Sequence, residues 1–430
     1  MSEMVTTHVT PTEVGVQSRD LLDSGFRRND EPAQSREMSP EDSLAALTRA
    51  CVSVINPKEL EDLLGAARPL RVKLGVDPTS PDLHLGHSVA LSKLRTFQDL
   101  GHTAVLIIGD FTALIGDPSG RDFTRPSLGE EEMKKNAETY KSQAFKILDP
   151  KKTEIRYNSE WLKPFMSEGL LSALKSITVQ QVLAREDFKQ RLKDNSPLTM
   201  LETLYPVFQG QDSVAVKSDI EIGGNDQLTN LLMGRKMQEL AGQKSQVIMT
   251  VPLLVGLDGV KKMSKSYGNA IGLTDSPRDI FGKTMSLSDD LMLNYYELLT
   301  TLDLDSLRAL HPMEAKKNLA QMLTARFHGE EAGVSERAFF EETFSKKNIP
   351  QDIPAAAFSP SVSLIEMILK SGAAKSKNEA RRLLDQGAVK IDGVKVMEDR
   401  PASLPQKFTL QAGKRHFLSV EIISEKEEIK

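Results

Sequence analysis

The chain has 430 residues, of which 39% are hydrophobic and 27% are charged, and this composition excludes a disordered or fibrous protein. Its 55 Lys and Arg residues and 60 Asp and Glu residues give a net charge of −5, which excludes a polycation that coats nucleic acid over its whole surface. The single cysteine, Cys51, excludes an internal disulfide and a cysteine-rich metal site, and no apolar run reaches the ~20 residues of a membrane helix. We therefore expect a cytoplasmic protein of two or three domains without membrane contact.

The N-terminal segment, residues 1–42, shows no hydrophobic periodicity. No apolar run follows a basic start, so the segment is not typical of a secretory signal, and we predict a disordered extension. A helical pattern begins near Ser43 and continues through residues 58–64.

A strand–helix–strand unit follows. Residues 71–76 predict a strand, residues 84–100 a helix ended by Gly101, and residues 104–109 a strand buried on both faces. Residues 246–255 predict a further strand of the same parallel sheet, so the fold class is α/β. Because such sheets bind ligands beyond the carboxyl ends of their strands, we expect chemistry in the loops that follow residues 76 and 108.

The rest of the chain indicates a helical region and a small α+β module. Residues 277–344 are rich in helix formers, and residues 349–360 have the proline-rich composition of a linker. Beyond the linker, residues 363–370 and 379–386 predict two helices. Residues 389–396 alternate around Asp-Gly and predict a β-hairpin.

The tetrapeptide His84-Leu85-Gly86-His87 lies at the start of the predicted helix. A helix start presents free N–H groups and favours phosphate, and two imidazoles add hydrogen-bond donors. Gly86 removes a side chain where a flat ring could approach the backbone. The alternatives are a surface turn with incidental histidines or half of a metal site.

A second motif, Lys262-Met263-Ser264-Lys265-Ser266, follows Asp258-Gly259 and precedes Gly268. This position predicts an exposed, mobile loop, and lysines clustered with hydroxyls suit a polyphosphate group. Taken without the histidine pair, the segment is more typical of a solvated basic loop.

Together the two motifs resemble the HIGH and KMSKS motifs of class I aminoacyl-tRNA synthetases; the second matches letter for letter, and the first has Leu85 for isoleucine. From about Ser43 onward the chain resembles bacterial-type tyrosyl-tRNA synthetases. The resemblance implies a Rossmann-like catalytic domain over 43–275 with a connective insertion at about 144–203. It further implies a helical anticodon-side domain over 276–348 and, after the linker, an S4-like RNA-binding domain over 361–430.

The resemblance also assigns roles to individual residues. It implies catalytic contacts with the reacting phosphates from His84, His87, Thr79, Lys262, Lys265, Arg121 and Arg125. It implies ATP-binding contacts from Gly75, Asp77, Gly86, Gly224, Asp226 and Lys265. It implies tyrosine-binding contacts from Asp117, Tyr205, Gln209, Asp212 and Gln227.

The proposed tyrosine site includes a regular polar stripe. Tyr205, Gln209 and Asp212 fall at i, i+4 and i+7 of a predicted helix and therefore share one face. The resemblance implies that Asp117 holds the substrate ammonium and that Asp212 accepts the phenol hydroxyl, although a solvated helix face is an alternative for the stripe. Where better-known members of the family carry a tyrosine, this chain has Lys73, which leaves the recognition of the phenol open.

The terminal module is basic, with 11 Lys and Arg residues against 6 Asp and Glu residues from Ser361 to Val420. Its charge of +5 contrasts with −10 for the rest of the chain and favours contact with RNA phosphates, although an idle basic surface is an alternative. The expected RNA contacts are Lys375, Lys377, Arg381, Arg382 and Lys390.

The function that the resemblance implies is tyrosine–tRNA ligation in a homodimer. Tyrosine and ATP, carried as its Mg²⁺ complex, would form tyrosyl-adenylate, and tRNA(Tyr) would then accept the amino acid; no metal site of the protein itself is expected. The alternatives are a tryptophanyl-tRNA synthetase, a nucleotidyltransferase with an RNA-binding domain, and a non-enzymatic RNA-binding protein.

Overall fold

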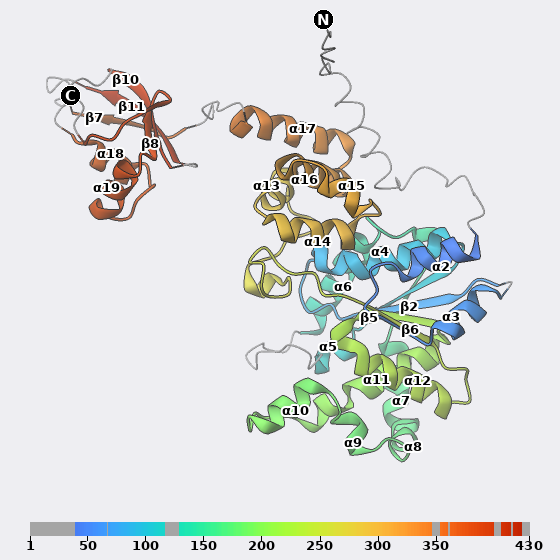
Figure 1. Ribbon diagram of the computed structural model, residues 1–430. Coiled ribbons are helices and arrows are strands. Elements are labelled where there is room, and N and C mark those ends of the chain that lie inside the picture. The colour runs from blue at the N-terminus through green and yellow to red at the C-terminus, as the bar shows by residue number, and fades with distance from the viewer. Residues whose placement is uncertain are drawn as a thin grey trace, which may run out of the picture. The chain divides into compact units, whose positions relative to one another are not determined.

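The computed structural model describes residues 39–66, 68–116, 129–345, 353–359, 362–399, 406–413 and 416–423. The chain divides into two compact units, with the boundary between Arg337 and Ala338 (Figure 1). The first helix, α2 (Pro40–Thr48), begins three residues earlier than the sequence predicted. Ser39 caps it by accepting a hydrogen bond from the Asp42 amide, and Pro40 fits the first helical turn, so the extension predicted over residues 1–42 does not reach residue 42.

A six-stranded sheet forms the centre of the first unit, in the order β1-β6-β5-β2-β3-β4. Its strands are β1 (Ser53–Ile55), β2 (Arg71–Val76), β3 (Thr103–Ile108), β4 (Thr153–Tyr157), β5 (Ile220–Gly224) and β6 (Val247–Val251). All neighbouring pairs are parallel except β1 with β6. The strands predicted at 71–76, 104–109 and 246–255 are confirmed as β2, β3 and a shorter β6.

The short strand β1 corrects the sequence prediction of a helical pattern that continues from Ser43 to residue 64. Val54 and Ile55 pair with β6, and Asn56 then caps helix α3 (Pro57–Leu64) with its side chain. Two β-branched residues beside an N-cap and a proline therefore interrupt the helical region.

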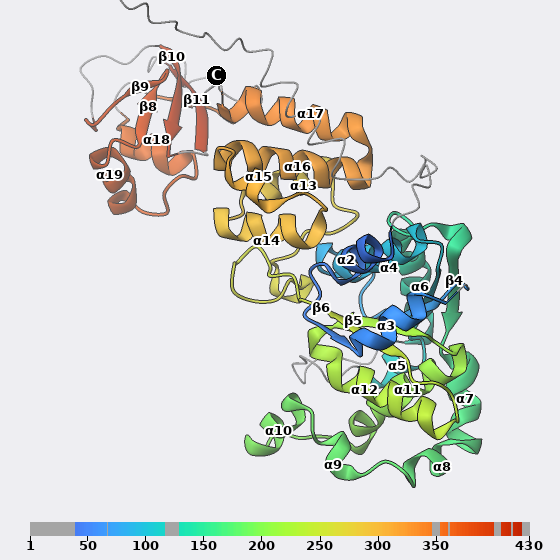
Figure 2. The same ribbon diagram turned by 45° about the vertical axis from the view of Figure 1, so that its right-hand side comes forward.

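Helices cover both faces of the sheet (Figures 1 and 2). One face packs against α4 (Leu85–Asp99), whose Leu91, Leu94 and Phe97 are buried in the largest core. The other face packs against α11 (Met200–Val216) through Val216, beside Val105 of β3. The remaining helices of this α/β part are α5 (Thr112–Ile115), α6 (Glu130–Ala144), α7 (Ser159–Glu168), α8 (Leu170–Leu174), α9 (Val179–Val182), α10 (Glu186–Lys193) and α12 (Leu228–Leu240).

The helical region predicted over residues 277–344 is confirmed. It comprises α13 (Pro277–Met285), α14 (Asp289–Leu299), α15 (Leu304–Arg308), α16 (Pro312–His328) and α17 (Glu330–Phe340), followed by one π-helical turn (Glu341–Ser345). Tyr295 and Tyr296 are fully buried, and their hydroxyls donate to backbone carbonyls at Val255 and Ala315. Among the helices of the described ranges, none has both the length and the apolar composition needed to cross a bilayer.

The second unit contains a five-stranded sheet with two helices and its own apolar core. Its elements are β7 (Ala355–Phe358), α18 (Leu364–Lys370), α19 (Lys377–Asp385), β8 (Val389–Ile391), β9 (Val394–Lys395), β10 (Lys407–Ala412) and β11 (His416–Ile422). Both predicted helices and the hairpin at 389–396 are confirmed.

Strand β7 corrects the predicted linker at 349–360. Residues 355–358 pair in parallel with β11, and the carbonyl of Pro354 accepts a hydrogen bond from the Ser419 amide at 2.8 Å. Because this pairing uses only backbone groups, the alanines join a sheet that their side chains do not predict. Residues 346–352 and 360 lie outside the described residues.

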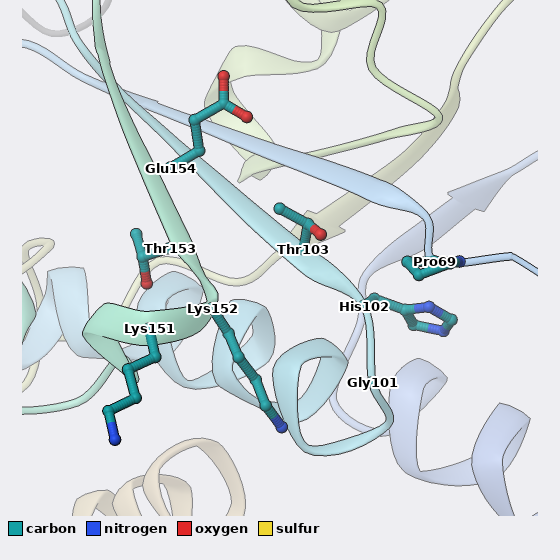
Figure 3. Close-up of a pocket in the computed structure, with 8 residues that line it drawn as sticks. All are labelled: Pro69, Gly101, His102, Thr103, Lys151, Lys152, Thr153 and Glu154. Atoms are coloured by element: carbon teal, nitrogen blue, oxygen red, sulfur yellow. The ribbon is translucent and has the colours of Figure 1, made fainter.

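An open pocket of about 310 Å³ lies at the amino ends of β2, β3 and β4 (Figure 3). Its lining residues are Pro69, Gly101, His102, Thr103, Lys151, Lys152, Thr153 and Glu154. The carboxyl ends of the same strands lie at the opposite edge of the sheet, so this pocket is distinct from the region in which the sequence places the chemistry.

Candidate active site

The histidine pair lies at the N-terminus of α4, beyond the carboxyl end of β2. His84 is the N-cap, and its Nδ1 accepts a hydrogen bond from the Gly86 amide at 3.2 Å. The Nδ1 atom of His87 accepts from the His84 amide, also at 3.2 Å, and the ring centroids are 4.0 Å apart. Since each Nδ1 is an acceptor, each neutral ring carries its proton on Nε2, where it can donate to a ligand.

Both imidazoles are neutral at physiological pH. Burial lowers the pKa of His84 to about 2, with further lowering by His87 and by the charges of Lys265 and Lys262. Burial likewise lowers the pKa of His87 to about 4, against a backbone hydrogen bond with His84 that raises it. The pair therefore offers hydrogen-bond donors and not fixed positive charges.

The lysine motif lies directly against the histidine motif. Lys265 Nζ is 2.5 Å from Oδ2 of Asp82, which stands two residues before His84 in the chain. Lys262 Nζ is 3.1 Å from Oδ2 of Asp226, beyond the end of β5. The structure thus brings together two segments that are about 180 residues apart in sequence.

Backbone pairing fixes this juxtaposition. The Leu85 amide donates to the Ile271 carbonyl at 2.9 Å, and the Leu273 amide donates to the Leu83 carbonyl at 3.0 Å. Met263, in the centre of the lysine motif, is buried, and its Cβ lies 3.7 Å from the position of a Cβ built on Gly86. Both lysines form ion pairs that are about one-third exposed, and such pairs contribute only about 0–1 kcal/mol, so they can be exchanged for a ligand anion.

Asp77, in the loop after β2, is held by two hydroxyl groups. Its Oδ1 accepts from Thr112 at 2.7 Å, and its Oδ2 accepts from the Tyr205 hydroxyl at 2.8 Å. A Cβ on Gly109 would lie 2.0 Å from Oδ1, so only glycine fits there, and sequence reasoning did not identify this residue. Thr79 lies in the same loop and donates its backbone amide to the Asp77 carbonyl.

Two predicted nucleotide-site glycines lie at strand ends. A Cβ on Gly75 of β2 would meet no atom within 4 Å, which leaves space above the sheet. A Cβ on Gly224 would lie 2.6 Å from Oδ1 of Asp226, so the glycine allows this carboxylate to approach the strand.

The polar stripe on α11 is not a solvated helix face, because Tyr205 is 6% exposed and Asp212 is 4% exposed. Asp212 Oδ1 accepts from Trp161 Nε1 at 2.8 Å. Burial raises the pKa of Asp212 to about 7; the positive charge of Lys73 and the Trp161 hydrogen bond oppose this rise, and Glu221 adds to it.

A partly buried amide network continues from Gln209 on the same helix. The Asn230 amide donates to Oε1 of Gln209 at 2.9 Å and to Oε1 of Gln227 at 2.7 Å. Arg185 in turn donates to Asn230 at 2.5 Å. Sequence reasoning found the two glutamines but missed Asn230, since nothing in its neighbouring sequence indicates the pairing.

Three predicted site residues, Asp117, Arg121 and Arg125, lie outside the described residues. Within the described ranges, no group of three or more His, Cys, Asp or Glu side chains could hold a metal ion.

The predicted RNA contacts gather around α19 in the second unit. Lys375, Lys377, Arg381 and Arg382 are exposed, and Lys390 on β8 is half-buried. Lys377 has a long ion pair with Glu366, at 3.6 Å. The basic groups of this helix are therefore accessible to a ligand within the unit itself.

Two family models match the chain. A model described as tRNA synthetases class I (W and Y) matches residues 66–345, and one described as the tyrosine–tRNA ligase SYY-like C-terminal domain matches residues 345–420. Together the two matches extend over both compact units.

Curated relatives match over most of the chain. A tyrosine–tRNA ligase of Thermotoga maritima is 47% identical over 393 residues, which covers 89% of this chain and 98% of that protein. A tyrosine–tRNA ligase of Aquifex aeolicus is 46% identical over 389 residues, with 89% and 99% covered.

Solved structures share the fold. The tyrosyl-tRNA synthetase of Archaeoglobus fulgidus, crystallised with L-tyrosine, gives a TM-score of 0.59 at 22% identity and covers 70% of this chain and all of that one. A truncated mitochondrial tyrosyl-tRNA synthetase of Aspergillus nidulans gives 0.59 at 18% identity, with 77% and 100% covered.

Proposed function

Because the chain belongs to the class I tRNA synthetases of the tryptophan and tyrosine type, we propose that it is a tyrosine–tRNA ligase. The observation that carries this proposal is the convergence of the neutral pair His84 and His87 with Lys262 and Lys265 at the carboxyl edge of the sheet. The match of residues 345–420 to the tyrosine–tRNA ligase SYY-like C-terminal domain favours tyrosine over tryptophan.

In the first step the tyrosine carboxylate attacks the α-phosphorus of ATP, the bond to pyrophosphate breaks, and tyrosyl-adenylate forms. The carboxylate is already ionised at neutral pH, so no protein base is needed, and the protein acts by positioning and by stabilising charge. Magnesium enters as part of the ATP substrate, since phosphate oxygens are hard ligands that suit it.

The histidine motif and the lysine motif would have different roles at the phosphates of ATP. The Nε2–H groups of His84 and His87 donate to oxygens that gain charge in the transition state. Lys262 and Lys265 leave Asp226 and Asp82 for the pyrophosphate oxygens, and Asp226 is then available to a ribose hydroxyl.

The amino acid would occupy the space between β2 and α11. Asp212, whose Oδ1 is fixed by Trp161, accepts the phenol hydroxyl, while Tyr205, Gln209 and Gln227 face the rest of the amino acid. We include Asp117 on the substrate ammonium, and Arg121 and Arg125 on pyrophosphate, as implied by the resemblance to the family.

In the second step a ribose hydroxyl of the terminal adenosine of tRNA(Tyr) attacks the tyrosyl carbonyl carbon, the bond to the adenylate phosphate breaks, and AMP and the hydroxyl proton leave. We assign the exposed basic residues of α19 to the tRNA phosphates. We further propose a cytoplasmic homodimer that uses the insertion at about 144–203, because this segment carries several large apolar side chains that are exposed. These are Met166, Leu171, Val179, Leu192, Met200 and Leu201.

Pyrophosphate exchange into ATP tests the proposal, run separately with tyrosine, tryptophan and phenylalanine. We expect exchange with tyrosine alone. Exchange with tryptophan would replace the proposal by a tryptophan–tRNA ligase, and no exchange with any amino acid would refute both. Light scattering coupled to gel filtration tests the dimer, and a monomer at micromolar concentration would contradict it.

A further inference from the structure

A fully buried ion pair lies beneath the proposed tyrosine site. Lys73 of β2 and Glu221 of β5 are register partners on neighbouring parallel strands, and Lys73 Nζ is 2.8 Å from Glu221 Oε1. Their side chains are 0% and 1% exposed. Such a pair contributes little to stability on balance, because desolvation offsets the attraction, so its presence calls for another explanation.

Every hydrogen of the Lys73 ammonium is already used. Besides Glu221, it donates to the Ser213 hydroxyl at 2.7 Å and to the Gln209 carbonyl at 3.2 Å. Three acceptors match the three N–H groups of a lysine, so Lys73 has no donor left for a substrate hydroxyl. Its contacts instead fix α11 at two positions one turn apart.

The Glu221 carboxylate is equally saturated. It accepts hydrogen bonds from Gln209 at 3.1 Å, from Ser213 at 3.1 Å and from the Gln246 side chain, in addition to its contact with Lys73. The pair therefore joins two strands to the helix whose adjacent residues face the proposed amino acid site.

We propose that Lys73, held by Glu221, is a positioning residue for tyrosine recognition: it fixes α11 at Gln209 and Ser213 and presents the positive charge that faces Asp212. The inference rests on the proposed function, since it concerns how the phenol acceptor is kept ionised and in place. Lys73 acts through Asp212 and does not contact the substrate.

The surroundings of Asp212 give the sign of the effect. Within the described residues, the charged groups with the largest effect on Asp212 are Lys73 from β2 and Glu221 from β5, while Trp161 and Asn158 contribute neutral donors. Loss of Lys73 would raise the pKa of Asp212 above its value of about 7, and neutralisation of Glu221 would lower it.

The test is the pH dependence of kcat/KM for tyrosine in pyrophosphate exchange, measured on the full chain. For Lys73→Met we expect the acid limb, the fall of kcat/KM at low pH, to move to higher pH by about one unit. Starting from a pKa of about 7 for Asp212, this shift is a ~5-fold rise in KM for tyrosine at pH 7, with KM for ATP unchanged. Discrimination against phenylalanine should fall by a similar factor. For Glu221→Gln we expect the acid limb to move to lower pH.

The opposite signs separate this role from a merely structural one, which would impair both variants in the same direction. The matched control is Lys93→Met, since Lys93 on α4 is also a buried lysine bound to carbonyls, at Ala46 and Arg49, but does not contact α11. We expect its tyrosine profile to match that of the wild type.

Shifts of the same sign, or no shift in either variant, would overturn the inference. If Lys73→Met does not fold, Glu221→Gln decides alone, because an unchanged or higher acid limb contradicts the inference. A wild-type protein without tyrosine-dependent exchange would instead refute the proposed function, so the two failures are distinguishable.

Discussion

Removal of the Lys265 ammonium tests the proposed role of the lysine motif most directly. In Lys265→Ala the transition state loses a charge-assisted contact with the leaving pyrophosphate, whereas the tyrosine site around Asp212 is untouched. We therefore expect the rate of adenylate formation to fall while the dissociation constant for tyrosine changes less than twofold.

The structure sets the magnitude of this loss. One preorganised donor to a developing charge contributes about 2.7–4 kcal/mol in known enzymes. The ion pair that Lys265 forms with Asp82 before the reaction offsets part of this contribution. The two side chains are 35% and 32% exposed, so the pair contributes only about 0–1 kcal/mol. A net loss of about 2–3 kcal/mol corresponds to a ~30- to 150-fold lower rate.

Single-turnover formation of tyrosyl-adenylate, with tyrosine binding measured separately by fluorescence or calorimetry, provides the assay. Lys261→Ala is the matched control, because Lys261 belongs to the same loop but does not pair with Asp82. Its Nζ lies 5.0 Å from the ring centre of Tyr267. We expect less than a threefold effect from the control. Equal losses of rate and tyrosine affinity in Lys265→Ala, or equal effects of both variants, would refute the reasoning.

Three further predictions concern protonation, packing and RNA. Burial lowers the pKa of His84 to about 2 and that of its partner imidazole to about 4, so both rings stay neutral as pH rises from 6 to 8. We therefore expect no change in the single-turnover rate from titration of these rings. A change of rate centred near pH 6.5 that disappears in His84→Asn would contradict the neutral state. Gly109→Ala places a Cβ 2.0 Å from a carboxylate oxygen and should destabilise the protein by about 1–3 kcal/mol in urea unfolding. The control Gly282→Ala, with open space around its Cβ, should not destabilise it. Equal urea midpoints for the two variants would count against the packing argument. The double variant Arg381→Glu/Arg382→Glu should raise KM for tRNA at least 10-fold and leave pyrophosphate exchange unchanged, and an unaltered KM would remove α19 from the RNA interface.

Local sequence patterns identified the elements that carry the motifs. The apolar run at 104–109 and the helical spacing after His84 are signals that each segment contains by itself, and both are confirmed in β3 and α4. The three-residue strand β1 and the alanines of β7 lack such a signal, because their pairing with β6 and β11 is decided by distant backbone groups.

The same distinction applies to the site. The motif lysines were found from their own sequence, whereas their partners Asp82 and Asp226 were not predicted as partners. The pairing of Lys73 with Glu221 depends on two strands being neighbours although they are about 150 residues apart in the chain. Contacts of this kind require the strand order, which periodicity does not provide.

The backbone bridge between residues 83–85 and 271–273 limits where the lysine loop can change its length during evolution or engineering. Ile271 and Leu273 are both fully buried in the core, and Gly272 between them pairs with His84. A single residue inserted after Gly268 would turn both apolar side chains outward and shift the pairing. At the tip of the loop Val260 is 83% exposed, so insertions there should be tolerated without disturbing the histidines.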